Sequence, residues 1–127
     1  MIKNLKTAII ILAAILLLIC SSHIYLNSSA QRMSDIINSA EKSAIEGNID
    51  AAFKQIDAFE SEWAFNKHVY ATFIRHAEID LANQSAAKLR AYLKDEDITD
   101  FIAECETLRM QIKHIAESDR FSLDNIF

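Results

Sequence analysis

The sequence predicts an all-α protein: an N-terminal transmembrane helix followed by a small antiparallel helical bundle, built as two stacked helical hairpins. The 127 residues include no proline and one glycine, Gly47, so helix breakers are rare in long stretches rich in Ala, Leu, Glu, Lys and Gln. After residue 28, apolar residues recur every three or four positions, as on one face of an α-helix. Before it, residues 7–26 contain no Asp, Glu, Lys or Arg.

Residues 7–26 are predicted to cross a membrane, because a helix of about 20 residues spans the roughly 30 Å of hydrocarbon. Lys3 and Lys6 precede this run, and basic flanks favour the cytoplasmic side. We therefore expect a membrane anchor at residues 1–27, a cytoplasmic N-terminus and an extracytoplasmic helical domain at residues 28–127. The expected localisation is the cell membrane, with a single pass.

A cleaved signal peptide is the alternative reading of the same segment. A signal peptidase requires small residues at positions −3 and −1 soon after the apolar core. The best matches here are residues 20–22, which fit this pattern poorly, and residues 28–30, which lie too far along the chain. Lipid attachment at Cys20 is disfavoured because the bulky Ile19 precedes it. Either way, the domain after the apolar segment is expected outside the cytoplasm.

Charge narrows the range of partners. All 18 acidic residues follow the apolar segment, whereas two of the 13 basic residues, Lys3 and Lys6, precede it, so residues 28–127 carry a formal charge of −7. A nucleic acid would be repelled by such a domain. The two cysteines cannot form a disulfide framework, because Cys20 lies in the apolar segment and Cys105 lies deep in the domain that follows it. Cys105 is expected to pack as a small buried residue.

The bundle is expected to contain four helices. The first either continues from the anchor or restarts near Ser28, and it ends at Gly47, which tolerates a left-handed C′ conformation before Asn48 caps the next helix. The second is expected from residue 49 to about 76, the third over 79–93, and the fourth from 98, with an apolar stripe that reaches 115. Residues 95–97 close the second hairpin, and the tail 121–127 is expected to dock on the bundle. Placing Ile49 on Ile98 aligns the apolar stripes of the second and fourth helices, which favours two stacked hairpins.

The densest polar cluster flanks the junction between the second and third helices. Its candidate metal ligands are His68, His76, Glu78 and Asp80. The simpler interpretation is structural: His76 caps the junction or forms a hydrogen bond there, and Arg75 pairs with Glu78 or Asp80. We expect this role, with no bound metal or cofactor.

The sequence gives no support for catalysis, because it lacks a Gly-rich phosphate loop, His-Glu-x-x-His and Gly-x-Ser-x-Gly. We therefore expect no enzyme, and we expect His114 to serve as a cation at the end of the fourth helix. The candidate interaction residues are Trp63, Phe65, His76 and Phe127. Trp63 continues the apolar stripe, so core packing is its simpler role, whereas Phe65 falls off the stripe and is the better candidate for an exposed contact.

Several features together resemble a known family: Trp63, the stretch 76–80 (His-Ala-Glu-Ile-Asp), the stretch 87–93, His114-Ile115, and the ending 121–127. The chain resembles an uncharacterised bacterial family of small proteins with one N-terminal anchor and a domain of unknown function, typical of spore-forming Gram-positive anaerobes. The resemblance implies no catalytic activity and no disulfide-forming compartment. It also implies association with polytopic membrane proteins.

These observations predict a membrane-anchored, non-enzymatic helical domain that binds a cell-envelope partner. An integral membrane protein is the expected partner, and self-association into a homo-oligomer is a further expectation. The alternative is a ligand or metal sensor that uses His76, Glu78 and Asp80 to bias the helix junction.

Overall fold

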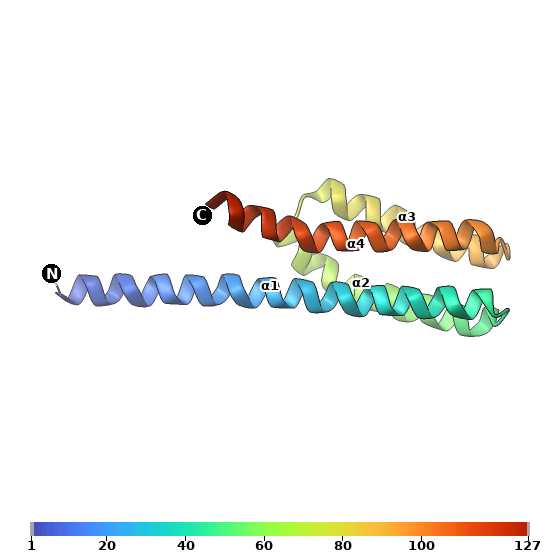
Figure 1. Ribbon diagram of the computed structural model, residues 1–127, viewed down its shortest axis with the longest axis horizontal. Coiled ribbons are helices and arrows are strands. Elements are labelled where there is room, and N and C mark those ends of the chain that lie inside the picture. The colour runs from blue at the N-terminus through green and yellow to red at the C-terminus, as the bar shows by residue number, and fades with distance from the viewer. Residues whose placement is uncertain (1, 127) are drawn as a thin grey trace.

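The computed structural model describes residues 2–126, except for the side chains of Phe73 and residues 118–126, and over this range it contains four helices and no strand. The helices are α1 (Ile2–Ile45), α2 (Ile49–Phe73), α3 (His76–Lys94) and α4 (Ile98–Ile126). The N-terminal part of α1 projects beyond the other three helices, and α4 extends back along α1 past the α2–α3 junction (Figure 1). The predicted all-α class, a long apolar helix followed by a helical bundle, is confirmed.

The apolar segment and the first bundle helix are one uninterrupted helix. An apolar stretch of α1 is long enough to cross a membrane, and only 6% of its most hydropathic window is buried in the protein. Burial against the bundle begins at Leu26 and continues through Met33, Ile37, Ala40 and Ala44. The expected boundary at residue 27 therefore falls inside a continuous helix. Of the two alternatives, the first bundle helix continues from the apolar segment and does not restart near Ser28.

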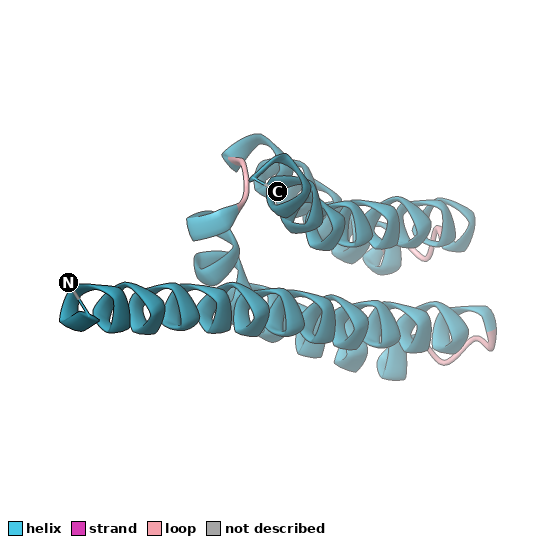
Figure 2. Ribbon diagram, turned by 60° about the vertical axis from the view of Figure 1, so that its left-hand side comes forward, coloured by secondary structure: helices cyan, strands magenta, loops and turns pink. Residues whose placement is uncertain are grey.

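The four helices form a ring in which each packs against two neighbours. α1 contacts α2 and α4, and α3 contacts the same two helices, with α2–α3 the least extensive of the four contacts. Successive helices run in opposite directions, so the turns α1–α2 and α3–α4 lie together at the end of the bundle that is far from the N-terminus (Figure 2). We call this end the distal end. The α2–α3 junction lies at the other end, the proximal end, where α1 enters from the apolar segment.

The two hairpins share one burial pattern at an offset of 49 residues. On the second member of each hairpin, Ala52, Ile56 and Phe59 are fully buried, as are their counterparts at 101, 105 and 108. The same offset relates the buried positions of α1 to those of α3: 30, 33, 37, 40 and 44 correspond to 79, 82, 86, 89 and 93. The sequence alignment of Ile49 on Ile98 thus reflects two similar hairpins that pack face to face.

Both distal turns use the same left-handed C-cap. The amide of Gly47 (φ 82°) donates to the carbonyl of Ala44 at 3.1 Å, and that of Asn48 donates to Ser43 at 2.9 Å, which is a Schellman motif. The Asn48 side chain then accepts from the amide of Ala51, as predicted. In the α3–α4 turn, Glu96 takes the position that Gly47 has in the α1–α2 turn, and its φ is 56°. This left-handed conformation costs a residue with a Cβ about 1 kcal/mol or more.

The α2–α3 junction lies a few residues earlier than predicted. α2 ends at Phe73 rather than near residue 76, because Ile74 and Arg75 are extended (ψ 152° and 137°) and the Ile74 side chain turns into the core. Consequently α3 begins at His76 rather than at Ile79. His76 is the first residue of α3, and the N-cap position before it is held by Arg75, which makes no side-chain cap, so His76 is not the N-cap of this helix.

The two left-handed positions give a paired test of the turn geometry. Glu96→Gly should stabilise the bundle by about 1 kcal/mol, because glycine adopts positive φ without a Cβ penalty. Gly47→Ala should destabilise it by about the same amount, and purely through the backbone, since an added Cβ would meet nothing within 4 Å. Chemical denaturation of the full-length protein in detergent micelles, followed by circular dichroism, measures both. A loss of stability in Glu96→Gly would contradict the assigned turn.

Candidate functional site

The proximal half of the α1–α2 contact holds a buried polar network. Asn66 is fully buried on α2, where its Nδ2 donates to the backbone carbonyl of Glu62 at 2.8 Å and to the Glu62 carboxylate at 3.1 Å. Its Oδ1 accepts from the Tyr25 hydroxyl of α1. A buried amide without partners would cost a few kcal/mol, so this arrangement makes a polar residue tolerable in the core.

A second link lies beside the first. The buried Ser29 hydroxyl donates to the carbonyl of Leu26 at 3.1 Å and therefore accepts from the Tyr70 hydroxyl. Burial raises the pKa of Tyr70 to about 12, so the hydroxyl stays protonated and available as a donor. The Tyr70 ring meets Trp63 edge-on at 5.9 Å, which ties this link to the aromatic core.

Trp63 is a core residue, as its place on the apolar stripe predicted. It is 5% exposed, stacks on Phe59 at 6.4 Å, and donates from Nε1 to Asn83 Oδ1 of α3 at 2.5 Å. Trp63 is therefore not an interaction residue as expected, because its ring is almost entirely covered by the protein's own side chains. Its indole nitrogen instead connects α2 to α3.

Phe65 lies on the surface, in agreement with its place off the stripe. It is 71% exposed and forms, with Val69 of α2 and with Ser21, Ser22 and Tyr25 of α1, an apolar pocket of about 420 Å³. These five residues are called the apolar pocket below. It opens at the proximal end, beside the last turns of the apolar segment.

A second hollow lies between α1 and α4 and encloses about 460 Å³. This α1–α4 groove is lined by Asn27, Ala30, Gln31 and Ser34 of α1 and by Glu106, Arg109, Met110, Lys113, Ala116 and Glu117 of α4. Arg109 of α4 joins one side of the groove to α1, because its Nη1 donates to the Glu41 carboxylate at 2.8 Å. The two side chains of this ion pair are only 24% and 19% exposed. Met110 is 65% exposed, so the groove combines an accessible thioether with charges of both signs.

The predicted polar cluster is not assembled into a metal site. His68, His76 and Asp80 are exposed, whereas the Glu78 carboxylate meets His114 Nε2 of α4 at 3.1 Å. Across the residues whose side chains are described, no group of three His, Cys, Asp or Glu side chains could hold a metal ion. Arg75 was expected to pair with Glu78 or Asp80, but the ion pairs of the described residues join Glu78 to His114 of α4 instead.

Two further expectations concern α4. His114 does not end the helix, since α4 continues to Ile126, so its predicted role at a helix terminus is wrong. Cys105 is buried, as expected, and burial raises the pKa of its thiol to about 12, which keeps it protonated at neutral pH. Phe127, the last interaction candidate, lies outside the described residues.

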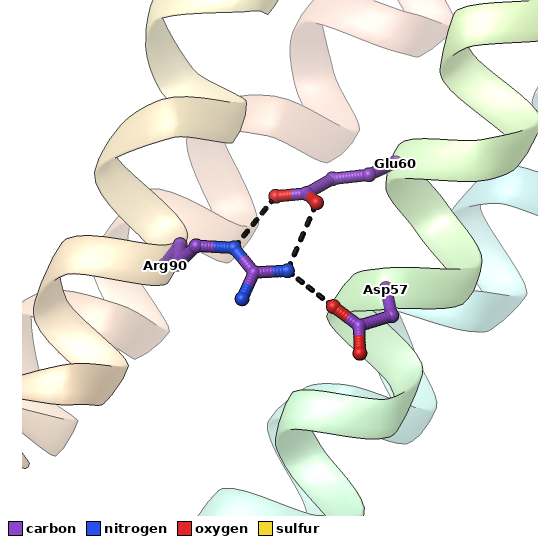
Figure 3. A network of polar contacts seen from close by, with 3 residues as sticks. All are labelled: Asp57, Glu60 and Arg90. Atoms are coloured by element: carbon purple, nitrogen blue, oxygen red, sulfur yellow. Dashed lines mark hydrogen bonds and ion pairs between the residues drawn. The ribbon is translucent and has the colours of Figure 1, made fainter.

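The α2–α3 contact contains an ion-pair cluster centred on Arg90 (Figure 3). Its Nε and Nη2 donate to the two carboxylate oxygens of Glu60, each at 2.9 Å, and Nη2 also reaches Asp57. These bonds, to Glu60 first and then to Asp57, raise the pKa of Arg90 above its ordinary value. Because all three side chains are partly exposed, the cluster contributes modestly to stability and more to the alignment of α3 on α2.

Sequence reasoning missed this cluster and the α1–α4 groove. Asp57 and Glu60 are three apart and so share a face of α2, which is a visible signal, but their partner is 30 residues or more away. Groove residues such as Gln31 and Lys113 are ordinary polar residues beside an apolar stripe. They become a site only once α4 is known to pack against α1.

The Arg90 cluster predicts a specific difference between arginine and lysine. Arg90→Lys keeps the charge but loses the two-pronged contact with Glu60, so stability should fall by about 0.5–1 kcal/mol. Lys88→Met, on an exposed position of the same helix, is the control and should change stability little. Denaturant unfolding at low and high salt measures both. A deficit in Arg90→Lys that fails to shrink at high salt would argue against an ionic origin.

Comparison with known proteins places the chain in a family. Residues 20–126 match the DUF4363 family, described as a domain of unknown function. No curated protein and no solved structure matches the chain. The match begins inside α1 and includes both hollows and the polar network described above. Since it covers most of the sequence, the protein belongs to the DUF4363 family.

Proposed function

We propose that this protein is a single-pass membrane protein whose helical bundle lies outside the cytoplasm and binds an integral membrane partner through the α1–α4 groove. The observation that carries the proposal is the position of that groove. Its first residue, Asn27, directly follows the apolar run 7–26, so the groove opens where the chain leaves the membrane. The bundle acts as an interaction module and not as an enzyme.

The continuous α1 supports this proposal by restricting where the bundle can be. A flexible linker would let the domain sample a wide volume, whereas an unbroken helix holds the bundle within a thin layer beside the membrane. Confinement of this kind raises the effective concentration of the bundle near other membrane proteins without any added contact. A protein that emerges from the membrane beside α1 meets the groove first.

The chemistry of the groove is that of a protein-binding surface. Methionine and arginine are enriched at interfaces, and Met110 and Arg109 both line this one. Glu106, Lys113 and Glu117 add charges of both signs along its α4 side. Such a mixed lining fits a partner segment with paired charges and an apolar contact better than a uniformly charged polymer.

Site-specific crosslinking in cells tests the groove. A photoreactive residue in place of Met110 should capture a membrane protein in stoichiometric amounts, because this side chain projects where the partner is expected. The matched control is Leu81 of α3, which is also exposed (52%) but is not among the groove-lining residues. Mass spectrometry of the adducts identifies the partner, and Met110→Asp should abolish co-purification whereas Leu81→Asp should not. Capture by both positions alike, or recovery of the chain alone, would contradict the proposal.

Protease treatment of intact cells tests the orientation. With the bundle outside, an added protease should digest residues 28–127 while a cytoplasmic marker protein stays intact. Digestion only after lysis would place the bundle in the cytoplasm and refute the orientation. A product beginning near residue 30 in untreated cells would show that the apolar segment is removed as a signal peptide.

A further inference from the structure

The apolar pocket is an exposed surface of the bundle with an almost wholly apolar lining. Of the large hydrophobic side chains that are described beyond residue 24, Phe65 is the most exposed, at 71%. The pocket beneath it presents almost no polar surface, because the hydroxyl of Tyr25 is used by Asn66 within the protein. Aqueous solvent is therefore a poor environment for this surface.

The depth of the apolar pocket relative to the membrane follows from the residues that α1 contributes to it. Its α1 members, Ser21, Ser22 and Tyr25, belong to the last turns of the run 7–26 that the membrane is proposed to cover. That run is about as long as the hydrocarbon layer is thick, so it cannot slide far toward the cytoplasm without exposing apolar residues. Phe65 and Val69, which line the same pocket, must then lie at the edge of the bilayer.

The charge of the neighbouring chain agrees with this placement. Residues 63–77 contain no Asp or Glu, although the domain as a whole is strongly acidic, and they include Lys67 and Arg75. This segment forms the end of α2, the α2–α3 junction and the start of α3, at the proximal end of the bundle (Figure 1). Carboxylates are thus absent from this segment itself, with Glu62 and Glu78 at its two boundaries, and the aromatic and basic residues that it contains are typical of the membrane interface.

We propose that the apolar pocket is a lipid-contact site, in which Phe65 and Val69 enter the bundle-side leaflet and acyl chains of the surrounding bilayer fill the space beside Ser21, Ser22 and Tyr25. The pocket is continuous with the lipid-facing surface of α1, whose Leu17, Leu18 and Ile24 are also exposed. This inference rests on the membrane span included in the proposed function.

Lipid contact on this side would fix the rotation of the bundle about α1. With 3.6 residues per turn, the pocket residues 21, 22 and 25 and the groove residues 27, 31 and 34 lie on roughly opposite sides of this helix. The side of α1 that bears α2 then leans on the membrane. The α1–α4 groove on the other side stays open to a protein.

Photocrosslinking in a defined bilayer tests the site. Full-length protein carrying a diazirine-containing residue at position 65 is reconstituted into phosphatidylcholine–phosphatidylglycerol vesicles, irradiated and analysed by mass spectrometry for lipid adducts. Ile11, in the middle of the run 7–26, is the positive control, and Ile45, at the distal end of α1, is the matched negative control. The three side chains are 71%, 54% and 62% exposed, so accessibility alone does not separate them.

We expect lipid adducts at positions 65 and 11 and none at position 45. Adducts at 11 but not at 65 would overturn the lipid-contact site while leaving the membrane span intact. No adduct at 11 would overturn the span and, with it, the inference. In cells, capture of a protein instead of lipid at position 65 would also overturn it and assign the pocket to a partner. Circular dichroism of each variant verifies that the bundle is folded.

Discussion

The arrangement of this protein depends on α1 remaining helical where the apolar segment meets the bundle. Local propensity does not ensure this, because residues 21–29 include four serines and an asparagine, all weak helix formers. Packing and hydrogen bonding compensate: Leu26 is buried, Tyr25 reaches Asn66, and Ser29 is held by Tyr70. The rigid connection between the apolar segment and the bundle therefore depends on the α1–α2 contact, and a change that loosens this contact would also loosen the position of the bundle relative to the apolar segment.

The polar network is specific to the first hairpin. At the offset of 49 residues, Asn66 corresponds to Ile115, which is buried among apolar neighbours in α4. The second hairpin thus has an apolar residue at this position, although it buries a polar residue elsewhere, Ser85 of α3. We infer that the hydrogen bonds in the first hairpin specify register more than they add stability, since a slip of α2 along α1 would leave Asn66 unpaired in the core. This register sets which residues of α2 lie beside the end of the apolar run, and so places Phe65 in the apolar pocket.

Much of the fold could be predicted because its signals are local. The stripes of α3 and α4, the stop at Gly47 with its Asn48 cap, and the core position of Cys105 all follow from spacing and residue type. The α2–α3 junction could not be placed exactly, since residues 74–75 have no glycine or proline and break the helix only because Ile74 packs inward. The functional surfaces depend on which helices are neighbours. Glu78 faces His114 and not Arg75 for that reason, and no periodicity within one helix could indicate it.

The size of the α1–α4 groove constrains how a partner can be bound. Stable complexes between freely diffusing proteins bury about 1,600 Å² in total and use about 20–30 residues on each side, whereas ten residues line this groove. Binding through this groove alone would be weak in solution. If the protein is confined to the membrane as proposed, that limit matters less, because confinement beside a membrane partner raises the effective concentration and a weak contact can then be well populated. Under the proposed function, the membrane span therefore provides proximity, and the groove needs only to provide selectivity.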